Sequence, residues 1–214
     1  MNELILLFQI ATIIGSCFLA ARISKEALVT LVCLQAVMAN FLVLKQIDLF
    51  GLQVTCSDAF AVGSILSLNL LQEEFGRDIA QKSTWICFGS MLFFALSSQL
   101  HLAYIPSAAD STHSYYQALL SPSPRLFCAS IASFLIVQQF DVLLYDFLKK
   151  RLPQWHFGSR STLSLMASQA LDTFLFTTLG LWGLVDSLPE VFIFSYLVKV
   201  LIISAIWIPA RQTL

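Results

Sequence analysis

The sequence predicts an all-α integral membrane protein, folded as a single bundle of six to seven transmembrane helices over residues 1–214. The composition is 57% hydrophobic and 12% charged, which is far more apolar than a soluble domain. Its apolar runs are about 20 residues long, the length of a membrane-crossing helix, and lack the ten-residue alternation of membrane barrels. The lipid bilayer is therefore an expected partner, and a net charge of −1 gives no indication of nucleic acid.

Seven segments are candidate spans: residues 3–21, 27–44, 54–71, 84–104, 125–148, 160–182 and 191–208. The first opens with Glu3 and no basic residue, which disfavours a cleaved signal peptide. The third carries five polar residues between Ser57 and Asn69, so it can span only if neighbouring helices shield it. If the first or third does not cross, the count falls to six. Residues 72–83 and 105–124 are predicted to be connections.

Basic residues predict the orientation. Nine of them, from Arg22 to Arg211, lie on alternate connections or at the C-terminus, and only Lys45 and Arg125 lie on the intervening connections. Cytoplasmic connections carry the excess of Lys and Arg in membrane proteins. The N-terminus is therefore predicted outside and the C-terminus inside a multi-pass protein of the cell inner membrane.

The segment 160–182 carries a carboxylate, Asp172, in its middle. Ser168 and Gln169 precede it by four and three residues and share its helical face. A charged residue at mid-bilayer costs about 2.5–3.5 kcal/mol on insertion scales, so it usually faces a partner or a cavity. This face is predicted to be wet, either as a substrate site or as a hydrogen-bonded clamp between helices.

Two further segments carry ionisable residues. Asp141 and Gln138 lie on a polar stripe of segment 125–148, and Tyr196 and Lys199 lie three residues apart in the last segment. Because an unpaired ammonium is as costly in lipid as a carboxylate, Lys199 is predicted to pair with Asp172 or Asp141. Asp58 and Asp146 are interpreted as interfacial residues.

The sequence gives no support for an enzyme. It contains no Walker, metalloprotease or serine-hydrolase motif, and no cofactor is expected. The five cysteines stand singly in apolar runs and are interpreted as small buried residues without a disulfide or metal role. The three histidines are isolated, with no second metal ligand at helical spacing.

An ordered set of residues resembles the queuosine precursor transporters, the YhhQ-like members of the vitamin uptake transporter family. The set consists of Asn69, Glu73, Phe75, Gly76 and Arg77, then Gln138 and Asp141, then Arg160, Ser168, Gln169 and Asp172, and finally Tyr196 and Lys199. Many members have Asp where this chain has Asn69, which places a cation-contacting role of that position in doubt. The resemblance covers the third to seventh segments.

The resemblance implies a small inner-membrane importer of 7-deazaguanine compounds, with a fold similar to the substrate-binding subunits of energy-coupling-factor importers. The predicted substrate-binding residues are Asn69, Glu73, Gln138, Asp141, Ser168, Gln169, Asp172, Tyr196 and Lys199, and the predicted gate or motif residues are Phe75, Gly76, Arg77 and Arg160. The residues from Glu73 to Gly76 can equally be a solvated helix end. An energising module or a second copy is a possible partner.

The chemistry of these side chains fits a guanine-like edge. Such an edge offers N1–H and an amino group side by side, and a carboxylate accepts from both. Asp172, Asp141 and Glu73 are candidate acceptors, while Lys199 and the amides are candidate donors to the ring carbonyl. A second carboxylate suits the cationic amine of an aminomethyl precursor, or queuine. Two alternatives remain: the substrate-binding subunit of an energised vitamin importer, and a membrane scaffold that transports nothing.

Overall fold

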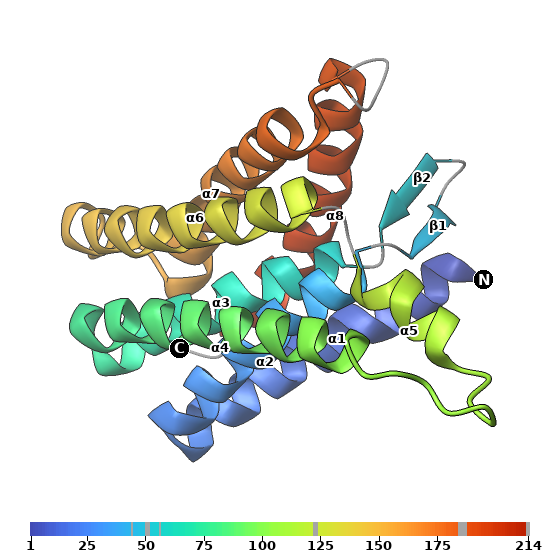
Figure 1. The fold of residues 1–214 in the computed structure, drawn as a ribbon. Helices are drawn as coiled ribbons and strands as arrows, with labels where there is room; N and C mark the ends of the chain where they lie inside the picture. Colours follow the sequence, from blue (N-terminus) through green and yellow to red (C-terminus); the bar gives the residue numbers. More distant parts are fainter. Residues whose placement is uncertain (44, 50–51, 56, 122–123, 184–187, 213–214) are drawn as a thin grey trace.

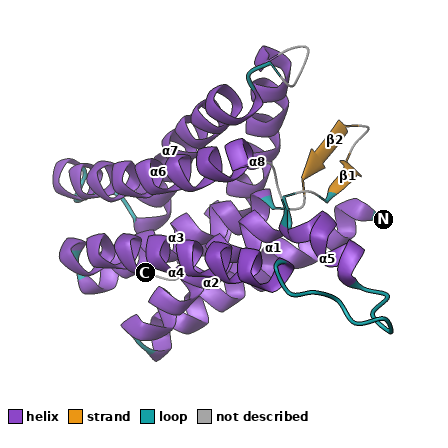
Figure 2. Cartoon of the chain, in the orientation of Figure 1, coloured by secondary structure: helices purple, strands orange, loops and turns teal. Residues whose placement is uncertain are grey.

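The computed structural model describes residues 1–43, 45–49, 52–55, 57–121, 124–183 and 188–212. In these residues it has eight helices and one β-hairpin (Figures 1 and 2). The helices are α1 Asn2–Ile23, α2 Lys25–Phe41, α3 Asp58–Phe75, α4 Arg77–Leu102, α5 His113–Leu120, α6 Pro124–Arg151, α7 Phe157–Leu181 and α8 Leu188–Gln212. The strands are β1 Gln46–Leu49 and β2 Leu52–Thr55, which pair antiparallel. The seven long helices correspond to the seven predicted segments, so the prediction of an all-α membrane protein is confirmed.

Within the described residues, four helices are long and apolar enough to cross a membrane: α1, α4, α6 from Arg125, and α8 as far as Ala205. Helix α2 has only 17 residues, and the other two long helices, α3 and α7, carry many of their polar side chains into the bundle. Ser64, Ser67 and Asn69 of α3, for example, are fully buried. Low hydropathy in these helices therefore marks an interior position and not a solvent-exposed one.

The helix α3 lies at the centre of the bundle and contacts α1, α2, α4, α6, α7 and α8. Every residue from Val62 to Gln72 is buried. Gly63 allows the close approach on one side, because a Cβ there would lie 2.2 Å from Gln35 Oε1 and 2.5 Å from Ile13 Cγ2. The expectation that neighbours must shield this polar helix is confirmed.

Two tight junctions reverse the chain. Ser24 alone separates α1 from α2, and its hydroxyl accepts a hydrogen bond from Ala27 N (3.2 Å), which caps the start of α2. Gly76 alone separates α3 from α4, with φ of 89°, a conformation that disfavours other residues. Both junctions and the α6–α7 connection lie at the left end of the bundle in Figure 1, and the hairpin and α5 lie at the right. Eight of the nine basic residues assigned to the cytoplasm lie in or close to these three segments of the chain: Arg22, Lys25, Arg77, Lys82, Lys149, Lys150, Arg151 and Arg160.

Four details differ from the sequence prediction. Residues 72–83, predicted as a connection, are helical except for Gly76, because that residue turns the chain without a loop. The predicted start of the third segment at residue 54 lies in β2, and α3 begins at Asp58. Residues 105–124 contain α5, which is held to α4 by an edge-to-face contact between His101 and Tyr116. Cys128 is exposed, whereas Cys17 and Cys87 are buried as predicted, and Cys56 lies outside the described residues.

Candidate functional site

One face of α7 contacts all three clusters of polar side chains in the interior of the bundle. Arg160, Ser164, Ser168 and Asp172 follow one another at intervals of four residues, so they form a stripe along the helix. At 1.5 Å per residue this stripe extends about 18 Å from Arg160 to Asp172. Arg160, at one end of the stripe, contacts a cluster that we call the Glu73 layer. Ser164 and Ser168, in the middle, contact the Asp141 layer. Asp172, at the other end, contacts the Lys199 layer.

The Asp141 layer occupies the middle of the stripe, where α3, α6 and α7 meet. Asp141 is fully buried, and its Oδ1 accepts hydrogen bonds from Ser164 Oγ (2.6 Å) and Ser168 Oγ (2.8 Å). Its second oxygen, Oδ2, has no hydrogen-bond partner among the described residues. No cation forms an ion pair with Asp141 in the described part of the chain. A buried carboxylate held only by uncharged donors is thus the central feature of this layer.

Buried amides lie on the three helices that meet at this layer. Asn69 Nδ2 donates to Ser161 Oγ (3.2 Å), Gln72 Nε2 to the Val142 carbonyl (3.0 Å), and Gln138 Nε2 to Ser64 Oγ (3.3 Å). The amide oxygens of Asn69, Gln72, Gln138 and Gln169 are buried without a protein partner among the described residues. In Asn69, Gln72 and Gln138 the nitrogen is the bonded end of the amide, so the oxygen is the free end. The free ends are acceptors, and they demand donors.

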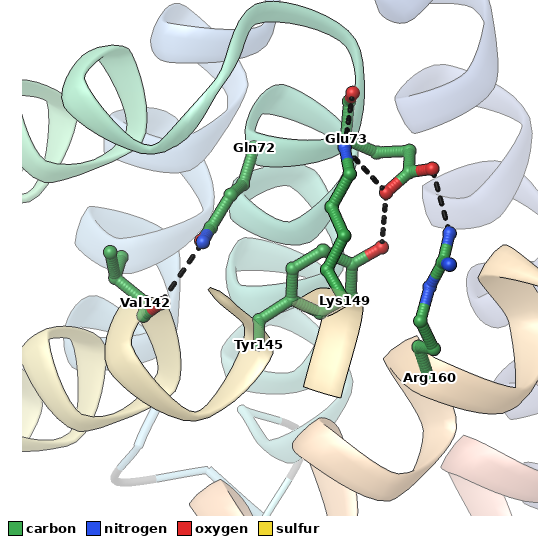
Figure 3. Close-up of polar contacts among 6 residues, drawn as sticks. All are labelled: Gln72, Glu73, Val142, Tyr145, Lys149 and Arg160. Atoms are coloured by element: carbon green, nitrogen blue, oxygen red, sulfur yellow. Dashed lines mark hydrogen bonds and ion pairs between the residues drawn. The ribbon is translucent and has the colours of Figure 1, made fainter. Parts of the chain in front are cut away.

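The Glu73 layer closes the stripe at the end where α3 and α6 finish and α7 begins (Figure 3). Glu73 Oε1 lies 2.8 Å from Arg160 Nη2, and Glu73 Oε2 lies 3.0 Å from Lys149 Nζ. The Tyr145 hydroxyl donates to the same Oε2 (2.9 Å), and Lys149 also donates to the Glu73 carbonyl (2.9 Å). Asn69 and Glu73, like Asp141 and Tyr145, stand four residues apart. The ion pairs therefore lie one helical turn beyond the Asp141 layer.

The Lys199 layer ends the stripe on the other side. Lys199 Nζ lies 2.6 Å from Asp172 Oδ2 and 3.9 Å from Asp58 Oδ1, which joins α8 to α7 and to the start of α3. The Lys199 side chain is only 6% exposed. Next to it, the Tyr196 hydroxyl donates to the Met166 carbonyl (3.2 Å) of α7. Of the two partners that the sequence allowed for Lys199, the structure chooses Asp172 and excludes Asp141.

The structure thus distributes the predicted site residues over three layers. Asp141 and Ser168 belong to the Asp141 layer, while Asn69 and Gln138 donate to the buried serines Ser161 and Ser64. Gln169 is buried on α7. Glu73 lies with Arg160, and Asp172 lies with Lys199, next to Tyr196. Among the predicted gate residues, only Arg160 enters a layer. Arg77 instead pairs with Asp146 (3.1 Å), Phe75 is 38% exposed, and Gly76 forms the turn.

Sequence reasoning missed five contributors: Asp58, Tyr145 and Lys149 in the charged layers, and Ser161 and Ser164 in the middle one. The two serines had a usable signal, because they lie seven and four residues before Ser168 on the face that also carries Asp172. The pairing of Lys149 with Glu73 had none, because it joins residues 76 positions apart.

Chemically, the three layers form a buried polar interior in which most of the unpartnered atoms among the described residues are acceptors. Such an interior is expensive in a bilayer, and membrane proteins that keep one usually use it for a substrate or an ion. Among the described residues there is no group of three or more His, Cys, Asp or Glu that could hold a metal ion. The free carboxylate and amide oxygens instead suit an organic ligand rich in N–H groups.

Apolar helices around a buried polar site are the architecture of a multi-pass membrane transporter. Residues 59–211 match the family model described as putative vitamin uptake transporter, and the chain belongs to this family. It is 28% identical over 169 residues to a Bacillus subtilis (strain 168) protein named probable queuosine precursor transporter, covering 76% of this chain and 72% of that protein. No solved structure matches the chain.

Proposed function

We propose that this protein imports a queuosine precursor of the 7-deazaguanine type across the cell inner membrane, with residues 1–214 acting as one transmembrane domain. Its family membership makes it a transporter. The substrate is suggested by the name of its Bacillus subtilis relative. The observation that carries the proposal is chemical: the buried Asp141 carboxylate has a free oxygen, and four buried amide oxygens nearby in the bundle are also free among the described residues.

A deazaguanine ring supplies the hydrogen-bond donors that these free oxygens lack. Its N1–H, its amino group and, in the aminomethyl form, its ammonium group can each donate to one of these free oxygens. Hydrogen bonds to a charged acceptor contribute about 1.5–3 kcal/mol each, enough to give both affinity and orientation. We assign the substrate contacts to Asp141, Asn69, Gln138, Ser168 and Gln169.

The charged layers take different parts in this proposal. Glu73 and Arg160 close the site toward the cytoplasm, since they lie at the end of the bundle where the basic residues gather. Asp172, Lys199 and Tyr196 line the opposite end. For a substrate to pass, at least one ion pair must open at each end in turn, as in transporters that expose one central site alternately to the two sides.

Binding and uptake measurements test the proposal. The purified chain is titrated with the nitrile, aminomethyl and queuine forms of deazaguanine, and labelled precursor is offered to cells that lack their own salvage protein. We expect binding of at least one form, and uptake that falls tenfold or more in Asp141→Asn, because the variant loses a charged acceptor. Asp110→Asn, in an exposed connection, is the matched control.

The same measurements separate the alternatives. Binding without uptake by the chain in proteoliposomes, restored by cell membranes and ATP, would identify a substrate-binding subunit of an energised importer. Absence of both binding and uptake, with correct insertion of the chain, would leave the scaffold interpretation.

A further inference from the structure

Among the described residues, Asp141 has no counter-charge. It is fully buried, and the hydroxyl groups of Ser164 and Ser168 donate hydrogen bonds to it. Its Oδ2 is free among the described residues. An ionised carboxylate in such surroundings is unfavourable by several kcal/mol unless a cation or several strong donors accompany it.

The ionisable groups on the surrounding helices are engaged elsewhere. On α3, Glu73 pairs with Arg160 of α7 and Lys149 of α6, and Asp58 faces Lys199. On α6 itself, Tyr145 donates to Glu73. On α7, Asp172 pairs with Lys199 of α8, and on α4 the Cys87 thiol lies 3.9 Å from Gln138 Nε2 while Arg77 pairs with Asp146. Each buried cation in the described chain, Arg160 and Lys199, is thus already paired with a carboxylate.

We propose that Asp141 holds a proton in the closed, substrate-free protein and exchanges it for the ammonium group of a cationic substrate, so that import is coupled to proton release. This inference rests on the proposed function, and it narrows the substrate to a deazaguanine that bears an alkylammonium group. In the substrate-free state a proton neutralises the Asp141 carboxylate, and in the substrate-bound state the ammonium group does so. The closed bundle therefore never contains an uncompensated Asp141.

The exchange balances in atoms and charge. When the site opens, the Asp141 O–H bond breaks and its proton leaves to water, while the substrate's ammonium approaches the carboxylate and keeps all of its own protons. On the other side the substrate leaves and a proton from water returns to Asp141. One cation moves in and one proton moves out, so the cycle is electroneutral and the membrane potential does not drive it. Accumulation in the cell then depends on the pH difference and on consumption of the imported compound.

The surroundings of Asp141 fit a cation better than a neutral ligand. The free side-chain oxygens of Asn69, Gln72 and Gln138 are acceptors, and no free lysine amine lies in the described layer. An ammonium group brings three donors, whereas the nitrile in its place brings none. The aminomethyl form therefore satisfies the layer, while the nitrile form leaves acceptors unpaired.

Proton release on binding tests this directly. The purified full chain is titrated with the aminomethyl and nitrile forms of 7-deazaguanine by calorimetry, in two buffers of different ionisation enthalpy. We expect release of about one proton per bound aminomethyl compound, because its ammonium group replaces the proton on Asp141. We expect no proton release for the nitrile compound, because it brings no cation to replace that proton. Binding of the aminomethyl form without proton release would overturn the inference and leave the proposed function intact. Absence of binding by every form would overturn the proposed function itself.

A transport measurement supplies the second readout. The chain is placed in proteoliposomes clamped at zero potential, and protein-free liposomes correct for passive amine partition. An interior more acidic by two pH units should concentrate the aminomethyl form by up to about a hundredfold, since each unit is a tenfold factor. Uptake that ignores the pH gradient, follows the potential, or requires an alkaline interior would contradict exchange.

Asp141→Asn should release no proton and lose the response to the pH gradient. The control is Asp110→Asn, at an exposed carboxyl whose pKa is lowered by the hydrogen bond from the Thr112 backbone N–H. It should behave as the parent protein. If Asp141→Asn fails to fold, the calorimetric result with the unmodified chain still decides the matter.

Discussion

The Lys199 ammonium lies 2.6 Å from Asp172 Oδ2 and so joins α8 to α7 inside the bundle. Asp58 Oδ1, at the start of α3, lies 3.9 Å from the same ammonium nitrogen. One cation therefore serves two carboxylates from two other helices. Its removal leaves two like charges close together in partly buried positions, which is the physical basis of the first prediction.

Lys199→Met should destabilise the protein by about 3 kcal/mol, because breaking a buried ion pair leaves charges without compensation. The triple variant Asp58→Asn, Asp172→Asn, Lys199→Met should recover most of this loss. The measurement is the melting temperature of the purified chain in detergent. Uptake by the stable triple variant should still fall tenfold or more, because the Lys199 layer is assigned to one end of the path. Full uptake by this variant would show that the ion pair is only structural.

Glu73→Gln should destabilise the chain strongly, because it leaves Arg160, whose side chain is 8% exposed, unpaired beside Lys149. The double variant Glu73→Gln, Arg160→Gln should recover much of the loss, since Lys149 is 38% exposed and can turn to water. A double-mutant cycle should give a coupling of about 1–3 kcal/mol.

The matched control for this cycle is Arg77→Gln. It breaks the more exposed pair with Asp146, and Lys150 still neutralises that carboxylate at 2.7 Å. Exposed pairs contribute about 0–1 kcal/mol, so the change should be small. Equal losses from Glu73→Gln and Arg77→Gln would mean that burial does not distinguish the two pairs.

Gly63→Ala should disturb the packing of α3 against α1 and α2. The added Cβ would lie 2.2 Å from Gln35 Oε1 and 2.5 Å from Ile13 Cγ2, so both neighbours must move. Overpacking of this kind costs about 1–3 kcal/mol, measured as a lower melting temperature. Gly15→Ala is the control, because nothing lies within 4 Å of its added Cβ and alanine favours a helix. A melting temperature for Gly63→Ala equal to that of Gly15→Ala would contradict the close approach.

The connection containing Ser111 should face outward and that containing Gln154 should face the cytoplasm. The prediction rests on the excess of basic residues at the end of the bundle that includes the α6–α7 connection. Both residues are exposed, so a cysteine at either position can react. In a background without native thiols, an impermeant reagent added outside should label position 111 and spare position 154. The reverse pattern would place the Glu73 layer on the outer side.

Much of the fold follows from the sequence alone. Seven apolar runs predict the seven long helices because apolar length and the need to satisfy backbone hydrogen bonds in lipid act locally. The polar stripe on α6 is also local, since its residues lie one or two turns apart. The length of the connection at Gly76 was harder to predict, because a single residue with positive φ can reverse the chain and make a loop unnecessary.

The tertiary structure decided which charges meet. From the sequence, Lys199 could pair with Asp172 or Asp141, since both lie on buried polar faces. The packing of α7 against α8 pairs it with Asp172. The contact of α6 with α7 gives Asp141 two serine partners and, among the described residues, no cation. The sequence by itself predicted that these groups lie on polar faces turned away from lipid, because spacing along a helix shows which residues share a face and a charge in lipid is costly. Only tertiary packing determined their partners, because an ion pair depends on the rotation and offset of helices that are distant in the chain.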